Sequence, residues 1–257
     1  MGSGVDSTTP TISATPELRE KFDRDGYFVL DDIGPSPEVI DAVVPELADE
    51  YSDGERVVHE GVVYDQTRIQ DAWRFNENVR AIARSPKVLA LLEDLYGREP
   101  LPFQTLNFYV GTQQATHSDA LHFNSMPPRY MCGVWVALED MDMDNGPLVY
   151  YPGSHRLPEV RMQDFGAEPR EDEYPKYERY IQELIEREGL EPAYGTIKKG
   201  QALFWAANLL HGGALQRDPK RTRHSQVTHY FFKGCRYYTP MLSSDTETFW
   251  RDPAWVV

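Results

Sequence analysis

The spacing of hydrophobic residues changes near residue 100, from a pattern typical of helices to one typical of strands. Before this point, three segments place Ser or Thr directly before Pro, as helices with a capping hydroxyl and a proline in the first turn do. The three pairs are Thr15-Pro16, Ser36-Pro37 and Ser85-Pro86. They predict helices over residues 16–24, 37–51 and 86–96, and a weaker pattern predicts another near 70–83. The stretch RDGYFVLDD predicts a turn and a short strand after the first helix.

Five apolar segments after residue 100 are bounded by Gly, Pro, Asn and Asp, which predicts strands. They are FQTLNFYVG, MCGVWVALED, GPLVYYPGS, GQALFWAAN and SQVTHYFFKG. Among them lies EDEYPKYERYIQELIEREG, whose apolar residues recur every three or four positions. This spacing predicts an amphipathic helix inserted at about 172–189.

Helices first and strands later indicate one α+β domain with a mainly β core, an antiparallel sandwich or barrel. The domain is expected to span 15–257, with a helical part at 15–100 and the β core at 101–240. The small polar residues 1–14 predict a disordered tail. No repeat or domain boundary is visible, and the sequence does not predict an oligomeric state.

Charge and cysteine content narrow the classes of partner. The net charge is −15, from 26 Lys and Arg against 41 Asp and Glu. Nucleic acid and anionic membranes need a positive surface, so neither is expected as a partner. No segment is apolar enough to span a membrane or to act as a signal peptide. Cys132 and Cys235 lie in strand-like runs and are expected as buried free thiols, which favours a cytoplasmic protein.

Candidate chemistry begins with His117-Ser118-Asp119. On a strand, alternate side chains share a face, so His117 and Asp119 would form half of a metal site. The same pattern is equally typical of an ordinary polar pair. His211 is the best third ligand, because it follows a strand-like run and precedes Gly212-Gly213, where backbone can approach closely. Two His and one carboxylate on one side of Fe(II) leave three positions open.

A cation follows His211 by about a dozen residues. Arg223 and Ser225 alternate onto one face of a predicted strand, and a guanidinium beside a hydroxyl suits a carboxylate. In an acidic protein, this cation looks like the anchor for an anionic cosubstrate. Arg221 is a rival with the same facing.

The order of these residues resembles the Fe(II)/2-oxoglutarate-dependent oxygenases. The stretches GVWVALEDMDMDNGPLVYYPGSHR, RDGYFVLDD and NLLHGG are similar, more narrowly, to the phytanoyl-CoA dioxygenase (PhyH) family, over about residues 16–240. The resemblance implies a double-stranded β-helix (jelly roll, cupin-like) with N-terminal helices packed around it. It implies that Fe(II) is bound by His117, Asp119 and His211. It further implies contacts to 2-oxoglutarate from Arg223, Ser225, Asn107 and Trp135.

The implied reaction consumes O₂ and 2-oxoglutarate, releases succinate and CO₂, and hydroxylates a C–H bond of a small molecule. Asp119 favours hydroxylation over halogenation, since related halogenases have a small residue in its place. Desaturation, epoxidation and cyclisation stay open, and the family name does not imply an acyl-CoA substrate. Candidate substrate contacts are His122, Phe123 and Tyr177, the last within a 160–195 insertion that we expect to form a lid.

Two other functions are compatible with the sequence. A jelly-roll protein can bind a ligand without catalysis, because a fold alone does not confer function. A cupin-like metalloenzyme would need no 2-oxoglutarate, and Arg223 would then have no role. Among the other histidines, His155 is expected to be structural, His224 to face outward and His229 to be a core residue.

Overall fold

The structure, a computed structural model, describes residues 13–52 and 55–257. Its main helices are α1 (Pro16–Asp25), α2 (Pro37–Leu47), α3 (Glu77–Ala83), α4 (Pro86–Tyr96) and α5 (Tyr174–Glu188). Short 3₁₀ helices are η1 (Ala72–Arg74), η2 (Asp119–Leu121), η3 (Ser154–Arg156), η4 (Met162–Phe165), η5 (Glu171–Glu173) and η6 (Pro240–Leu242).

The helix starts agree with the Ser/Thr-Pro pattern. The hydroxyls of Thr15 and Ser85 accept hydrogen bonds from amides in the first turns of α1 and α4, whereas the hydroxyl of Ser36 makes no such bond. Two helix predictions were wrong in extent. The segment near 70–83 divides into η1 and α3, because Asn76 caps a new helix between them. The helix predicted to reach residue 51 ends at Leu47, where the chain turns.

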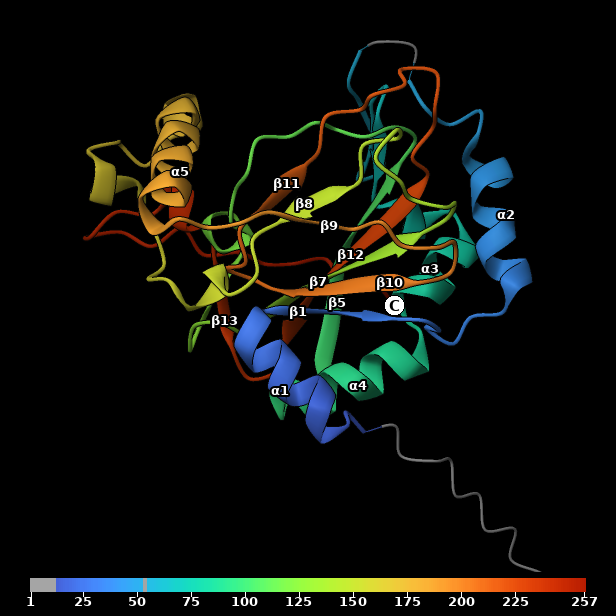
Figure 1. Cartoon of the computed structure of the whole chain (residues 1–257), viewed down its shortest axis with the longest axis horizontal. Helices are drawn as coiled ribbons and strands as arrows, with labels where there is room; N and C mark the ends of the chain where they lie inside the picture. Colours follow the sequence, from blue (N-terminus) through green and yellow to red (C-terminus); the bar gives the residue numbers. More distant parts are fainter. Residues whose placement is uncertain (1–12, 53–54) are drawn as a thin grey trace, which may run out of the picture.

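An eight-stranded antiparallel sheet forms the centre of the molecule (Figure 1), in the order β1-β10-β7-β12-β5-β4-β3-β2. Its strands are β1 (Tyr27–Leu30), β2 (Val57–His59), β3 (Val62–Tyr64), β4 (Arg68–Gln70), β5 (Pro100–Phe108), β7 (Met131–Ala137), β10 (Ala202–Ala206) and β12 (Ser225–Phe232). The smaller sheets contain β11 (His211–Gly213), β8 (Leu148–Tyr150) and β9 (Ala193–Tyr194), and β13 (Arg236–Tyr238) with β6 (Asn124–Met126). All five strand predictions are confirmed, and the meander β2–β4 was not predicted.

The two faces of the large sheet have different partners. Val134 and Val136 of β7 belong to the core cluster that includes the buried faces of α2, α3 and α4. Trp135, between them, points the other way and belongs to the cluster that includes Leu148 and Tyr150 of β8. Side-chain alternation therefore builds a helix layer on one face and a second sheet over the other. This arrangement of an antiparallel sheet, a second sheet on one face and helices on the other agrees with the predicted jelly-roll core.

The inserted helix α5 lies at one end of this sandwich, as predicted (Figure 1). Its buried face, Tyr177, Ile181, Leu184 and Ile185, belongs to a separate hydrophobic cluster that also contains Leu121 and Leu210. Leu121 is two residues after Asp119 and Leu210 directly precedes His211. The insertion therefore packs on both segments that carry the predicted metal ligands.

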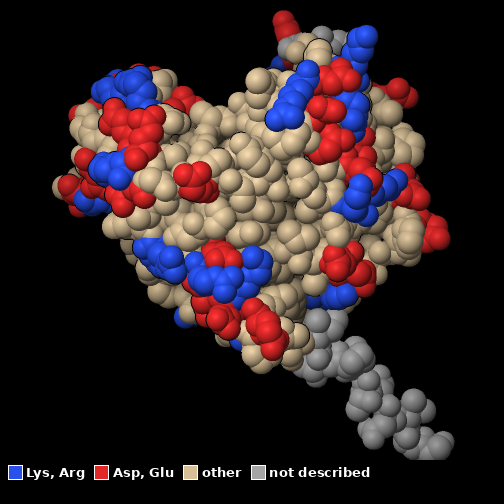
Figure 2. Space-filling view, in the orientation of Figure 1, with Lys and Arg blue, Asp and Glu red and all other residues tan. Residues whose placement is uncertain are grey.

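Charged side chains are unevenly distributed on the face shown in Figure 2. They gather over α5, over α2 and around α1, with both signs mixed, whereas the surface over β8 and β9 is largely uncharged. None of the helices in residues 13–52 and 55–257 is long and apolar enough to cross a membrane.

Three predictions for single segments need comment. Most of the predicted tail lies outside the described residues, but its last residue, Ala14, is buried and donates its amide hydrogen to Asp94. Both cysteines are free thiols, as expected. Cys132 is buried, but Cys235 is only partly so, because it follows a turn at Gly234 and lies beside the guanidinium of Arg98.

Candidate metal and cosubstrate site

Backbone pairing brings the two predicted histidine ligands together. The amide of His117 donates to the carbonyl of His211 at 2.8 Å, and the amide of His211 donates back at 2.9 Å. The imidazole centroids are 4.5 Å apart. This close pairing requires Gly212 and Gly213, since a Cβ on either residue would lie only 2.7 Å from backbone atoms of Gln114 or Gln113. The absence of side chains at Gly212 and Gly213 thus lets the backbone that precedes His117 pack directly against β11.

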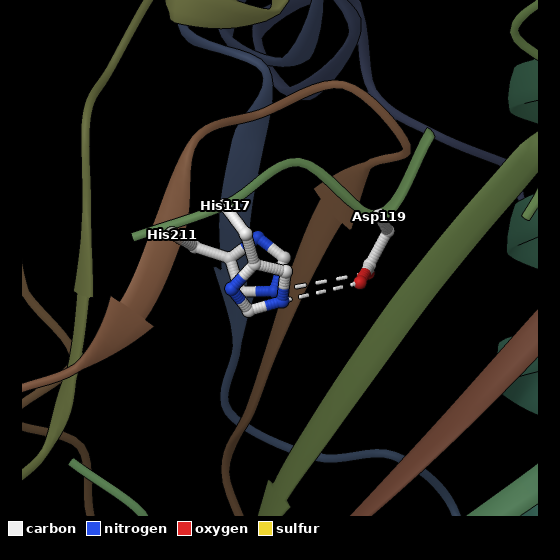
Figure 3. A group of neighbouring side chains, drawn as sticks. All are labelled: His117, Asp119 and His211. Carbon is white, nitrogen blue, oxygen red and sulfur yellow. Dashed lines mark ion pairs between the residues drawn. The ribbon is translucent and has the colours of Figure 1, made fainter. Parts of the chain in front are cut away.

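Asp119 reaches the histidines in a way that the sequence did not predict. His117 and Asp119 do not share a strand, because the hydroxyl of Ser118 accepts a hydrogen bond from the amide of Ala120 and caps η2, which begins at Asp119. Figure 3 shows the carboxylate facing both imidazoles. Its oxygens lie 3.6 Å from Nε2 of His117 and 3.7 Å from Nε2 of His211. One ligand atom from each of the three residues lies within 4.8 Å of the others.

Hydrogen bonds fix which nitrogen each imidazole presents. Nδ1 of His117 lies 3.0 Å from the carbonyl oxygen of Ala115, and Nδ1 of His211 lies 3.0 Å from that of Leu209. A carbonyl can only accept, so each Nδ1 carries hydrogen and each Nε2 has its lone pair free for a metal.

Electrostatics keep Asp119 and His211 in their metal-binding protonation states. Burial lowers the pKa of His211 to about 4, although the Asp119 carboxylate opposes this shift. Burial also disfavours the charge on Asp119, but the surrounding imidazoles, above all that of His211, outweigh it and hold its pKa well below the ordinary value. At neutral pH the site therefore offers a carboxylate and a neutral imidazole, the forms that bind divalent metals.

The predicted anchor lies in the same cavity. Arg223, Trp135 and all three candidate ligands line it, together with Phe108, Val227 and both glycines of β11. Arg223 is only 3% exposed, its Nε has no hydrogen-bond partner, and its guanidinium lies 5.4 Å from the ring centroid of Phe108 and 5.6 Å from that of Trp135. None of the ion pairs in the described part of the chain includes Arg223. Burial lowers the pKa of Arg223 to about 10, so it is still a cation at neutral pH.

Arg221, the rival anchor, does not reach this cavity. Its guanidinium forms an ion pair with Asp142 at 3.2 Å, and its side chain is 39% exposed. The geometry therefore favours Arg223 as the residue available to an anionic ligand.

Of the two other predicted cosubstrate contacts, Asn107 faces away from the cavity, whereas Ser225 shares the face of β12 that carries Val227. Asn107 is paired in register with Gln226 and donates to its side chain at 3.2 Å. Gln226 in turn reaches the carbonyl of Val79 in α3, so Asn107 is on the helix-covered face and does not line the cavity. Side chains alternate between the two faces of β5. Leu106 and Phe108 line the cavity, so Asn107 between them points to the opposite face. Ser225 is fully buried, and its hydroxyl donates to the carbonyl of Arg223 at 3.4 Å.

The predicted substrate contacts are divided between the cavity region and the core. Tyr177 is fully buried and does not line the cavity, because its hydroxyl accepts a hydrogen bond at 2.8 Å from the amide of Ser118. His122 lies near His117, with ring centroids 6.1 Å apart, and its Nε2 is 3.4 Å from the hydroxyl of Tyr174 in α5. Phe123 packs against the rings of Phe103 and His229.

Sequence reasoning missed three residues that line the cavity. Arg68 comes from the unpredicted strand β4, and Trp205 lies at the centre of β10. His229, expected in the core, is buried but also lines the cavity, with its Nε2 3.6 Å from Asp119. Its sequence spacing from Arg223, Ser225 and Val227 indicated that it could point into the barrel, although it was assigned to the core. His155 is structural as expected, since its Nε2 donates to the carbonyl of Asp23.

A jelly roll with two histidines, one carboxylate and a buried guanidinium in a single cavity defines the class of 2-oxoglutarate-dependent metalloenzymes. The model of the family described as phytanoyl-CoA dioxygenase (PhyH) matches residues 22–225. The chain belongs to this family. The predictions of the family, and of an enzyme class that uses Fe(II) and 2-oxoglutarate, are thereby confirmed.

Individual relatives are distant. The ectoine dioxygenase of Nocardia farcinica is 26% identical over 242 residues, which cover 84% of this chain and 78% of the relative. The peroxisomal phytanoyl-CoA dioxygenase of Rattus norvegicus is 25% identical over 199 residues, which cover 73% of this chain and 53% of the relative. The chain thus spans about half the length of that relative.

Solved structures confirm the fold. EctD from S. alaskensis with 2-oxoglutarate and 5-hydroxyectoine has a TM-score of 0.64 at 24% identity, covering 89% of this chain and 79% of that one. The carbocyclase SnoK from nogalamycin biosynthesis has a TM-score of 0.64 at 17% identity, covering 88% and 87%.

Proposed function

We propose that this dioxygenase hydroxylates an unactivated C–H bond of a small metabolite or natural-product intermediate, with His117, Asp119 and His211 as the iron ligands. The observation that carries the proposal is the buried guanidinium of Arg223 in the cavity that the three ligands line: its Nε has no hydrogen-bond partner, and none of the ion pairs among the described residues includes it. A buried cation without a counter-ion is costly, so its presence favours a bound anion.

The residues fit both iron and 2-oxoglutarate. Two fixed Nε2 lone pairs and one carboxylate match the donor set of the facial triad. Arg223 would pair with the distal carboxylate of 2-oxoglutarate, and Trp135 has a buried indole N–H without a partner in the same wall. Bound iron supplies the oxidising chemistry with O₂, while 2-oxoglutarate becomes succinate and CO₂. The protein's part is to hold the ligands, orient the cosubstrate and exclude water.

The presence of Asp119 supports hydroxylation over halogenation, since no space is left for a halide in the ligand set. The relatives support a small substrate, as one is named an ectoine dioxygenase. Others are named an epimerase and a carbocyclase, so cyclisation, desaturation and epoxidation are the alternatives that use the same site.

The substrate is proposed to enter beneath α5. Tyr174 of this helix contacts His122, which lies beside the ligand His117. His122 and Phe123 stay in the proposal as substrate contacts, whereas Tyr177 does not, because it supports the metal-binding segment from the core.

Anaerobic addition of 2-oxoglutarate to the Fe(II) protein tests the proposal. Chelation of Fe(II) by a keto acid gives a weak visible charge-transfer band, which we expect in the wild type and not in His211→Ala. The matched control is His224→Ala, which removes a half-buried histidine that does not line the cavity. Iron binding without the band would favour a cupin-like enzyme, and no iron binding would favour a non-catalytic binding protein.

The reaction type needs a second readout. Incubation with candidate small molecules, followed by mass spectrometry, should show a product heavier by one oxygen atom and an equal amount of succinate. A product lighter by two hydrogen atoms would indicate desaturation or cyclisation in place of hydroxylation.

A further inference from the structure

The two oxygens of Asp119 have different neighbours. Oδ1 lies 3.6 Å from Nε2 of His117. Oδ2 accepts a hydrogen bond at 2.8 Å from the indole N–H of Trp205 and lies 3.6 Å from Nε2 of His229. Trp205 is 1% exposed and His229 is 4% exposed, so neither group competes with bulk water. Oδ2 thus accepts a hydrogen bond from a group that is not a candidate metal ligand, while Nε2 of the candidate ligand His211 lies 3.7 Å away from it.

These two groups belong to one row across the large sheet. Trp205 on β10 pairs in register with Gly133 on β7, and Gly133 pairs on its other side with His229 on β12. A Cβ on Gly133 would lie 2.2 Å from the Trp205 ring, so only glycine leaves room for the indole there. The indole is therefore seated on the sheet backbone and its N–H points at Oδ2.

His229 is held with similar firmness. Its Nδ1 donates to the side-chain oxygen of Gln104 on β5 at 3.0 Å, so Nε2, which faces Asp119, carries no hydrogen. Its ring also packs against Phe103 and Phe123, with centroids 6.0 Å and 5.2 Å away. These contacts fix the imidazole plane beside Asp119.

We propose that Trp205 is a positioning residue that holds Oδ2 of Asp119 through its hydrogen bond and keeps it out of the metal coordination, and that the ring of His229 positions the same carboxylate by lying beside it. This inference rests on the proposed iron ligands. A carboxylate that binds through both oxygens occupies an additional position, whereas the facial triad needs three open positions for a chelating keto acid and O₂. A hydrogen bond from Trp205 to Oδ2 leaves Oδ1 as the oxygen free to bind. Groups that orient metal ligands in this way typically change metal affinity by about 10- to 100-fold when removed.

The test measures Mn(II) binding to the metal-free full-length protein, from the electron paramagnetic resonance signal of free Mn(II). We expect Trp205→Phe to raise the Mn(II) Kd about ten-fold or more. Bound Mn(II) should also take up 2-oxoglutarate more weakly, because the freed oxygen competes for a coordination position. The matched control is Trp73→Phe, which removes another buried indole–carboxylate hydrogen bond, to Asp71 at 3.2 Å, away from the cavity. Its Mn(II) Kd should match that of the wild type.

A second pair of variants covers the case in which Trp205→Phe does not fold. His229→Leu replaces the flat imidazole beside Oδ2 with a branched side chain of different shape and should weaken Mn(II) binding, whereas His229→Gln keeps a polar side chain of similar reach there and should recover much of it. A wild-type Kd in Trp205→Phe or in His229→Leu would overturn the role of that residue. The proposed function fails differently, namely if the wild type does not bind Mn(II) or if His211→Ala binds it equally well.

Discussion

Replacing Arg223 with Met should have effects of opposite sign on stability and on cosubstrate binding. Burial lowers the pKa of the guanidinium from 12.5 to about 10, which corresponds to roughly 3 kcal/mol against the charged form. Because the group stays charged below pH 10, this cost is fully present at neutral pH. Met has a similar length and no charge. The metal-free protein should therefore gain about 1–3 kcal/mol in free energy of unfolding, as replaced buried ion groups often do.

The same substitution should weaken 2-oxoglutarate binding. Truncating one partner of a buried charge pair costs about 2–5 kcal/mol, because the other charge is left without its partner. At about 1.4 kcal/mol per factor of ten, the Kd of 2-oxoglutarate should rise roughly 30-fold to several thousand-fold. Urea unfolding of the metal-free protein measures the first effect. Anaerobic titration of the Fe(II) protein, followed by the visible charge-transfer band, measures the second.

Arg221→Met is the matched control, since it removes a guanidinium two residues away that pairs with Asp142 at the surface. Exposed pairs contribute about 0–1 kcal/mol, so this variant should bind 2-oxoglutarate as the wild type does and gain no stability. The reasoning would be refuted if Arg223→Met kept the wild-type affinity or if Arg221→Met lost it. Destabilisation by Arg223→Met would show that the guanidinium has a structural partner.

Three further outcomes follow from the site. Burial lowers the pKa of His122 to about 4, so the unfolded chain binds a proton below about pH 6.5 that the fold does not. The contribution of neutral His122 to the free energy of unfolding is therefore fully present above pH 6.5 and decreases by about 1.4 kcal/mol per pH unit toward pH 4. His122→Asn should reduce this pH dependence, measured by urea unfolding at pH 7, 6 and 5. Tyr177→Phe leaves the buried amide of Ser118 without an acceptor, which should cost about 1–3 kcal/mol and raise the Mn(II) Kd, whereas Tyr174→Phe should leave that Kd unchanged. Gly212→Ala places a Cβ 2.7 Å from the carbonyl oxygen of Gln114, so Mn(II) titration should show weaker binding as His117 is pushed away.

The parts of the fold that could be predicted are those whose pattern is long enough to show a period. β7 and β12 are seven or eight residues long and wholly buried, and α5 repeats its apolar positions over four turns. The meander β2–β4 has strands of three residues, and all of β2 is exposed, including Val57 and Val58. These strands form because β2 pairs with β3, β3 with β4, and β4 with β5. Such pairing depends on tertiary structure, so the local sequence pattern does not predict it.

The site shows the same division between local motif and tertiary placement. His117 and Asp119 could be found because only one residue separates them, and His211 because Gly212-Gly213 directly follows it. The strand expected for His117 and Asp119 was wrong because the Ser118 hydroxyl stabilises a 3₁₀ turn, a competition that short polar side chains often win. Trp205 could not be found, because it lies within an apolar buried strand and no neighbouring residue marks it as a partner of Asp119.

The placement of Arg223 explains how a protein with a net charge of −15 can hold an anionic cosubstrate. At the surface several of its guanidinium groups pair with carboxylates, as Arg221 does with Asp142 and Arg161 does with Asp245. A surface arginine is therefore already neutralised and offers little to a free anion. Arg223 differs from these surface arginines. Phe108 and Trp135 cover it, and none of the ion pairs in the described part of the chain includes it. Burial of the Arg223 guanidinium therefore favours binding of a carboxylate and also lowers the stability of the metal-free protein. The opposite effects expected for Arg223→Met on stability and on 2-oxoglutarate binding test this one cause by two independent measurements.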